Sequence, residues 1–107
     1  MRSQSAPGST LFGSRRRTEV LLVLALLDET YPTELAAHIM APLYSVQKIV
    51  AALEREGVVT TTLRNHARWV KLDPRYAAHA ELRELLLRLA EGEVYLKAVA
   101  STLRDRR

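Results

Sequence analysis

Residues 33–72 read TELAAHIMAPLYSVQKIVAALEREGVVTTTLRNHARWVKL and decide the fold. The pattern predicts a short helix over 33–40, because Leu35 and Ile39 lie four residues apart and therefore share one helix face. The segment that follows contains Pro42, which lacks a backbone N–H and ends that helix. The segment thus opens with a short helix and a tight turn.

A second helix is predicted over 42–56. Proline is tolerated at a first helical position because its missing N–H would have no partner there, and Gly57 supplies the stop. One face has the apolar spacing of a buried stripe, formed by Val46, Ile49, Val50 and Leu53. The opposite face is then exposed and carries Ser45, Gln47, Lys48, Ala51, Ala52 and Arg55.

Two strands follow this helix. Residues 58–63 are rich in β-branched side chains, which favour strands, and residues 68–72 form the returning strand. The turn at 65–67 begins with Asn65, a residue that adopts positive φ at low cost. The sequence therefore predicts a two-stranded hairpin directly after the second helix of the pair.

Helices flank this segment on both sides. Upstream, a helix over 14–27 is capped by Ser14 and is apolar nearly all round, which predicts a central place in the core. Residues 1–13 are rich in Ser, Gly, Pro and Thr, and we expect a flexible arm. Downstream, residues 76–106 are helical, and Gly92 either splits them into two helices or lets a partner approach closely.

The order helix, short helix, turn, helix, hairpin, helix is that of a winged helix-turn-helix, a mainly α fold with a small β-hairpin. In such a fold the second helix of the helix-turn-helix lies in the DNA major groove, and the hairpin forms a wing that contacts the DNA backbone. We expect a DNA-binding domain over 14–74 and a C-terminal helical region over 75–107. The candidate DNA contacts are Tyr44, Ser45, Gln47, Lys48, Ala51, Arg55, Arg64, His66, Arg68 and Lys71.

Charge and side-chain chemistry favour double-stranded DNA as the partner. The chain has 16 Lys and Arg against 12 Asp and Glu, a net charge of +4, and residues 41–76 hold six cations against three acids, which is +3. Gln47 suits bidentate bonding to adenine, and Lys48 suits guanine or a phosphate. The hairpin cations, above all Arg64 and Arg68 beside its tip, suit phosphates.

Five short stretches match a known pattern: LFGS at 11–14, ELA at 34–36, SVQK at 45–48, LEREGVV at 53–59 and RWVKLDP at 68–74. On these stretches, residues 11–90 resemble the ArsR-like winged helix-turn-helix regulators of bacteria and archaea. The resemblance implies a dimeric transcriptional regulator, usually a repressor, with dimer contacts from the first and last helices. Met40 departs from the family pattern, which commonly has a turn glycine at this position.

The C-terminal leucines predict a homodimer, because they give more apolar surface than a small domain covers alone. We expect the interface to contain Leu82, Leu85, Leu86, Leu89, Leu96, Val99 and Leu103.

Catalysis, metals and cofactors are not expected. The chain has no cysteine, its histidines show no ligand-like spacing, and we find no phosphate loop or nucleophile motif. His38 is expected on a helix surface, and Trp69 is expected to pack in the core or on the sheet. The apolar run at 20–27 is too short to span a bilayer, so we expect a cytoplasmic, nucleoid-associated protein without a membrane partner.

Two alternatives stay open. One is a winged-helix protein-interaction module, favoured by the small side chains of Ala51 and Ala52. The other is an architectural DNA binder without sequence preference. The arginines at 15–17 fit equally well a phosphate clamp and a solvated first turn. No effector is evident from the sequence.

Overall fold

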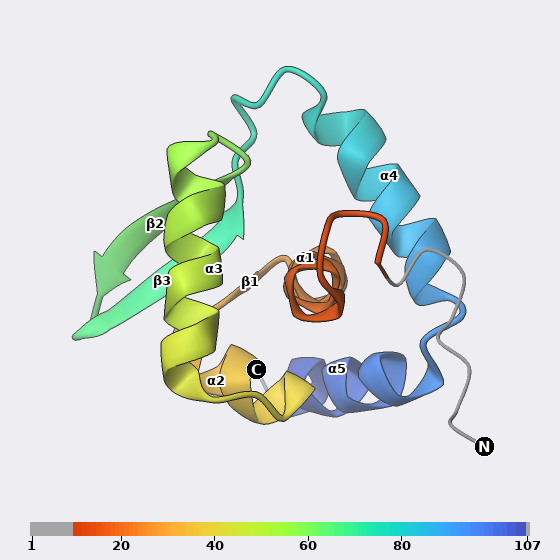
Figure 1. Ribbon diagram of the computed structural model, residues 1–107. Coiled ribbons are helices and arrows are strands. Elements are labelled where there is room, and N and C mark those ends of the chain that lie inside the picture. The colour runs from red at the N-terminus through yellow and green to blue at the C-terminus, as the bar shows by residue number, and fades with distance from the viewer. Residues whose placement is uncertain (1–9, 107) are drawn as a thin grey trace.

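The computed structural model describes residues 10–106, which form five helices and a three-stranded sheet (Figure 1). The predicted order of helix, short helix, turn, helix and hairpin is confirmed, as is the mainly α class. The arm predicted for residues 1–13 lies largely outside the described residues. The helices are α1 (Arg15–Leu27), α2 (Pro32–Ile39), α3 (Leu43–Arg55), α4 (His79–Ala90) and α5 (Val94–Arg106). The strands are β1 (Glu29–Thr30), β2 (Val59–Arg64) and β3 (Ala67–Leu72).

The central element is α1, which is seen end-on in the middle of Figure 1 with the other helices and the sheet around it. Ser14 caps this helix as predicted, because its Oγ accepts a hydrogen bond from the Arg17 N–H at 3.0 Å. All six residues from Val20 to Ala25 are at most 2 % exposed. Since six consecutive residues cover every side of an α-helix, α1 is surrounded by protein, as its sequence predicts.

The turn between α2 and α3 is built on Met40. This residue has left-handed backbone angles, φ 55° and ψ 51°, and its N–H donates to the Ala37 carbonyl at 3.3 Å. Pro42 follows with an extended ψ of 141°, so it caps α3 and is not its first helical residue. The predicted start of this helix at residue 42 is therefore one residue early. The turn bends the chain by 118° between the two helices.

The sheet has one strand more than the sequence predicts. β1 pairs antiparallel with β3, Glu29 opposite Lys71, and gives the strand order β1-β3-β2. The residues of β1 follow the predicted helix over 14–27, and a two-residue strand has no period that a sequence can show. The hairpin turn is also tighter than predicted. Asn65 and His66 both have positive φ, as a two-residue turn requires, and Ala67 already belongs to β3.

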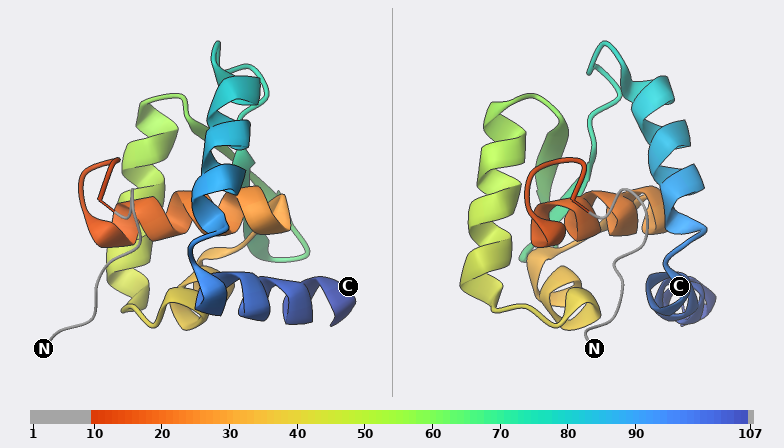
Figure 2. Two further views of the ribbon diagram at one scale, coloured as in Figure 1. Left: turned by 90° about the vertical axis from the view of Figure 1, so that its right-hand side faces the viewer. Right: turned by 45° about the vertical axis from the view of Figure 1, so that its right-hand side comes forward.

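The C-terminal region forms two helices that meet at an angle (Figure 2). Residues 91–93, which include Gly92, separate them, so the predicted interface residues lie on two helices and not on one. α4 and α5 both pack against α1. Their residues Leu86 and Leu96 are 0 % and 2 % exposed within one chain. These two leucines therefore belong to the core of the chain itself.

α5 also covers α2, and this contact buries His38. The side chain is 3 % exposed, and its Nε2 lies 3.2 Å from the Leu96 carbonyl oxygen. The prediction of a surface histidine is therefore wrong, because the partner that covers it lies 58 residues further along the chain. Burial lowers the pKa of His38 below its ordinary value of 6.5.

Candidate nucleic-acid interface

α3, which lies on the left-hand side of Figure 1, has one long face of exposed side chains. The predicted buried stripe is confirmed, since Val46, Val50 and Leu53 are at most 5 % exposed and Ile49 is half-buried. The opposite face is exposed at Tyr44, Gln47, Lys48, Ala51 and Arg55. The structure therefore brings all the predicted α3 contacts to one side of the helix, with Ser45 half-buried at its edge.

On the wing side, α3 borders a hollow of about 320 Å³. Its lining includes Gln47 and Ala51 from α3 and Arg68 from β3. A second hollow, of about 380 Å³, shares Gln47 and Arg68 and adds Thr33 and His66. Residues that are far apart in the sequence thus meet in one groove between the helix and the wing. Thr33, at the start of α2, was not among the predicted contacts.

Arg68 is held against α3 by a chain of hydrogen bonds. Its Nη1 donates to the Thr61 hydroxyl at 3.2 Å, and that hydroxyl donates to Glu54 Oε2 at 2.8 Å. Thr61 lies on β2 and Glu54 on α3, so the chain links the wing to the helix. The result is a fixed position for the guanidinium at the edge of the groove.

On its other side, α3 borders a hollow of about 380 Å³ that it shares with the start of α1. Arg16 Nη1 donates to Ser45 Oγ at 3.3 Å across this hollow. Lys48 also lines it, with its Nζ 5.3 Å from the centroid of the Tyr44 ring. Ser14, Arg15 and Ile49 complete the lining. In the sequence, this contact is indicated by the run of arginines at 15–17, which fits a phosphate clamp and a solvated first helical turn equally well.

The three hairpin cations do not share one surface. Side chains alternate between the two faces of a strand, so Arg68 and Lys71, three residues apart, point to opposite faces. Arg64 lies opposite Ala67 in the ladder and shares the face of Lys71. The three predicted phosphate contacts thus lie on two faces of the wing, and whether each of them contacts DNA stays a prediction. The sequence could have signalled this, because the parity of the three positions is visible in it.

Arg64 is bound to its own sheet. Its Nη2 donates to Glu29 Oε1 at 2.9 Å, and its guanidinium carbon lies 4.6 Å from the centroid of the Trp69 ring. The Trp69 ring also meets Tyr31 edge to face, with 5.1 Å between the ring centroids. Trp69 therefore packs on the sheet, as predicted, and Arg64 covers it.

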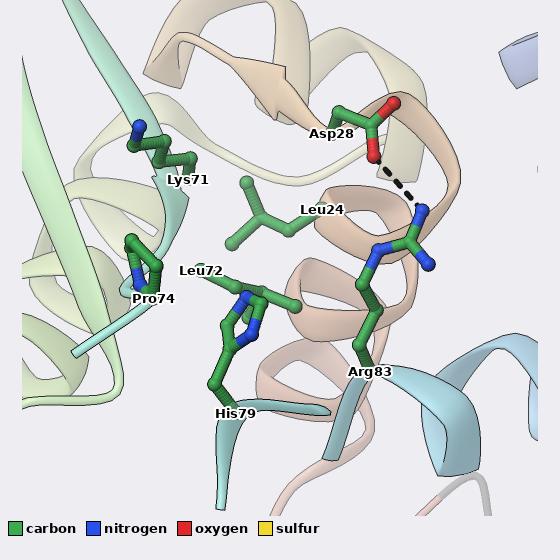
Figure 3. A pocket seen from close by; sticks show the side chains of 7 residues that line it. All are labelled: Leu24, Asp28, Lys71, Leu72, Pro74, His79 and Arg83. Atoms are coloured by element: carbon green, nitrogen blue, oxygen red, sulfur yellow. Dashed lines mark hydrogen bonds and ion pairs between the residues drawn. The ribbon is translucent and has the colours of Figure 1, made fainter. Parts of the chain in front are cut away.

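Lys71 borders a pocket of about 220 Å³ formed by α1, β3, α4 and the segment between β3 and α4 (Figure 3). The pocket contains one ion pair, in which Arg83 Nη2 donates to Asp28 Oδ1 at 3.1 Å. His79 and Pro74 also point into it, and its floor is made by Leu24 and Leu72. None of these lining residues comes from α2 or α3, so the pocket lies apart from the exposed face of α3.

The residues of the predicted dimer interface are divided between core and surface. Leu82, Leu89 and Leu103 are partly buried against the core, and Val99 is half-buried. Leu85 is 41 % exposed. The first turn of α5 adds Val94 and Tyr95, which are 78 % and 52 % exposed. In α4 and α5, as far as the structure describes them, the large apolar side chains left exposed are thus Leu85, Val94 and Tyr95.

Residues 10–106 show no group of three His, Asp or Glu side chains that could hold a metal ion. In the same residues, no single helix is long and apolar enough to cross a membrane. α2 and α3 satisfy that test only when taken together, across their 118° bend.

Comparison with known proteins identifies the fold. No protein-family model matches the chain, and no curated protein matches it. Mutant MarR from E. coli matches with a TM-score of 0.61 and 18 % identity, over 89 % of this chain and 68 % of that one. The organohalide-sensing transcriptional regulator RdhR-CbdbA1625, in its 2,4-dichlorophenol-bound form, matches with a TM-score of 0.59 and 23 % identity, over 91 % of this chain and 66 % of that one. The chain thus has the winged helix-turn-helix fold and spans about two thirds of the length of each match.

Proposed function

We propose that this protein is a transcriptional regulator that binds double-stranded DNA sequence-specifically as a homodimer. The observation that carries the proposal is the exposed face of α3, which lies between two hollows lined by cations from other elements. The fold is shared with a protein described as a transcriptional regulator. The ArsR-like sequence pattern adds the expectation that the regulator is a repressor.

In this proposal α3 enters the major groove, which is wide enough to admit a helix. Gln47 lies on the wing side of the exposed face and is suited to bidentate bonding with adenine, whereas Lys48 suits guanine or a phosphate. Ala51 is small and exposed, so the helix can approach the groove wall closely and meet a thymine methyl group. Tyr44 and Arg55, at the two ends of the helix, then face the flanking backbone.

The wing contributes through Arg68 and His66. Both line the groove beside Gln47, and the hydrogen bonds through Thr61 hold the Arg68 guanidinium in place. Arg64 and Lys71 have a different role from Arg68, because their side chains lie on the other face of the sheet. We assign Arg64 to support of the wing and leave Lys71 outside the DNA contacts.

A dimer would place two α3 helices in successive major grooves, about 34 Å apart, over a two-fold related site. Of the predicted interface residues, Leu85 remains most exposed, and Leu82, Leu89, Val99 and Leu103 remain partly accessible. Leu86 and Leu96 are excluded because one chain already buries them. No enzymatic role is proposed.

A second candidate function rests on the turn before α3. Met40, Leu43 and Tyr44 are 74 %, 41 % and 69 % exposed and form an apolar surface at the start of the helix. Such a surface suits a protein partner, so a winged-helix interaction module is the alternative.

Salt dependence separates the two functions. Binding to a random-sequence duplex through about six phosphates should weaken roughly a thousandfold between about 50 and 200 mM salt, because neutralised phosphates release counterions. We would measure this by fluorescence anisotropy with the full chain. Docking of a protein on the apolar surface would change little with salt, and a folded chain that binds no duplex at low salt would contradict the proposal.

A further inference from the structure

The three arginines at the start of α1 differ in their partners. Arg15 Nε lies 3.3 Å from Glu19 Oε2 and its Nη2 lies 3.7 Å from Glu93 Oε1. Arg17 Nη2 lies 2.7 Å from Glu56 Oε1. Arg16 forms no ion pair with any side chain in residues 10–106, and its guanidinium donates to the neutral Ser45 hydroxyl. Within the described residues, Arg16 is therefore the one of the three that has no carboxylate within ion-pair distance, although its charge acts on the Glu19 carboxylate from further away.

The hollow around Arg16 has the chemistry of an anion site. Its lining side chains include three cations, Arg15, Arg16 and Lys48, and two hydroxyls, Ser14 and Ser45. Among the residues that the structure describes, no carboxylate lines it. The groove on the wing side differs, because Glu54 lines it beside Arg68. An anion that approaches α3 from the α1 side thus meets donors and positive charge without a facing carboxylate.

The position of this hollow points to the kind of anion. Ser45 and Gln47 are two residues apart on α3, which places them about 200° apart around the helix axis. They therefore mark opposite edges of its exposed face, Gln47 toward the wing and Ser45 toward α1. A helix in the major groove is flanked by one phosphate backbone on each side. The wing side faces one backbone, and the Arg16 hollow faces the other.

We infer that Arg16, with Ser45 and Lys48, binds a DNA backbone phosphodiester on the α1 side of α3, opposite the backbone contacted by the wing. This inference rests on the proposed function. Arg16 Nη1 already reaches the Ser45 hydroxyl, so guanidinium and hydroxyl are close enough to bind the same phosphate oxygens. Contact with both backbones fixes how α3 is rotated in the groove, and with it which bases Gln47 meets.

The test compares Arg16→Ala with wild type on random and selected duplexes over a range of salt concentrations. We expect the plot of log affinity against log salt to become less steep by about one, with a similar weakening on both duplexes, because a phosphate contact carries no base preference. Arg16→Lys should restore most of the slope. Arg88→Ala is the matched control, because Arg88 is exposed on α4 and forms no ion pair within the described residues.

The outcomes distinguish this inference from the function on which it rests. If wild type binds no duplex, both are overturned. If wild type binds duplex with a steep salt dependence and Arg16→Ala keeps that slope, only the inference is overturned. Inorganic phosphate is the probe for a different ligand. Its saturable binding to the free chain, lost in Arg16→Ala while the duplex slope stays unchanged, would assign the hollow to a free phosphate and overturn the DNA contact.

Discussion

The guanidinium of Arg64 covers the ring of Trp69, with 4.6 Å between the guanidinium carbon and the ring centroid. The same guanidinium donates to Glu29 on β1. Arg64 thus joins the tip of the hairpin to the strand at the other edge of the sheet. This contact gives the wing a fixed shape. It also directs the Arg64 guanidinium toward the protein, although the sequence predicts that Arg64 contacts DNA.

The two wing arginines should respond differently to removal. Arg68→Ala should weaken binding to a random duplex about tenfold at low salt, which is about 1.4 kcal/mol, through loss of a charged contact. Arg64→Ala should weaken it less than about twofold, because its charge is already paired with Glu29. Anisotropy titrations of both variants measure this difference. Equal losses would show that Arg64 also contacts the DNA.

Neighbouring leucines on α4 should separate folding from dimerisation. Leu86 is 0 % exposed and Leu85 is 41 % exposed. Leu86→Ala should lower the free energy of unfolding by about 2–5 kcal/mol, as loss of a buried leucine does, which a urea titration measures. Leu85→Glu should leave the fold intact by circular dichroism and shift the molar mass in light scattering from dimer to monomer. A Leu85→Glu protein of unchanged dimer mass would place the interface elsewhere.

Glycine in place of Met40, in the strained turn before α3, should stabilise the fold. Met40 has φ 55° and a side chain that is 74 % exposed, so replacement loses little burial. Met40→Gly should raise the free energy of unfolding by about 0.5–1 kcal/mol, because glycine adopts left-handed angles without a steric cost. Met40→Ala is the control and should give no such gain. Destabilisation by Met40→Gly would mean that the methionine side chain makes a contact worth more than the strain.

His38 should make the fold sensitive to acid. Burial lowers its pKa in the folded chain below the ordinary 6.5, so the unfolded chain binds a proton more readily than the folded chain. The contribution of His38 to stability is therefore complete above about pH 6.5 and is lost as the pH falls from there toward the folded pKa. Urea titrations across this range should show the decline in wild type and a smaller one in His38→Gln. Identical profiles would assign the acid sensitivity to other groups.

Elements with a long local pattern were predictable from the sequence. The apolar character of α1 and the stripe on α3 are each repeated over several turns, and Asn65 marks a turn by its own conformational preference. These patterns are set by neighbours in the chain. The exposed face of α3, and so most of the candidate site, followed from them.

The features that were not predictable depend on distant partners. β1 exists because β3 pairs with it, and His38 is buried because α5 returns to cover α2. Arg16 becomes part of the α3 surface only when α1 crosses beside Ser45, 29 residues away in sequence. A local pattern contains no information on which distant element arrives at a given face. The opposite faces of Arg68 and Lys71 are the exception, because strand alternation would have revealed them.

The most direct test of the account is the ratio of affinities for selected and random DNA. Duplexes would be selected from a random library with the wild-type chain. The affinities of wild type and Gln47→Ala for the selected duplex and for random duplex would then be measured at a fixed salt concentration. The account predicts a palindromic winner bound at least about a thousandfold more tightly than random DNA, with a ratio reduced about tenfold or more in Gln47→Ala. A wild-type ratio near one, from a folded dimer that binds both duplexes, would contradict sequence-specific reading by α3.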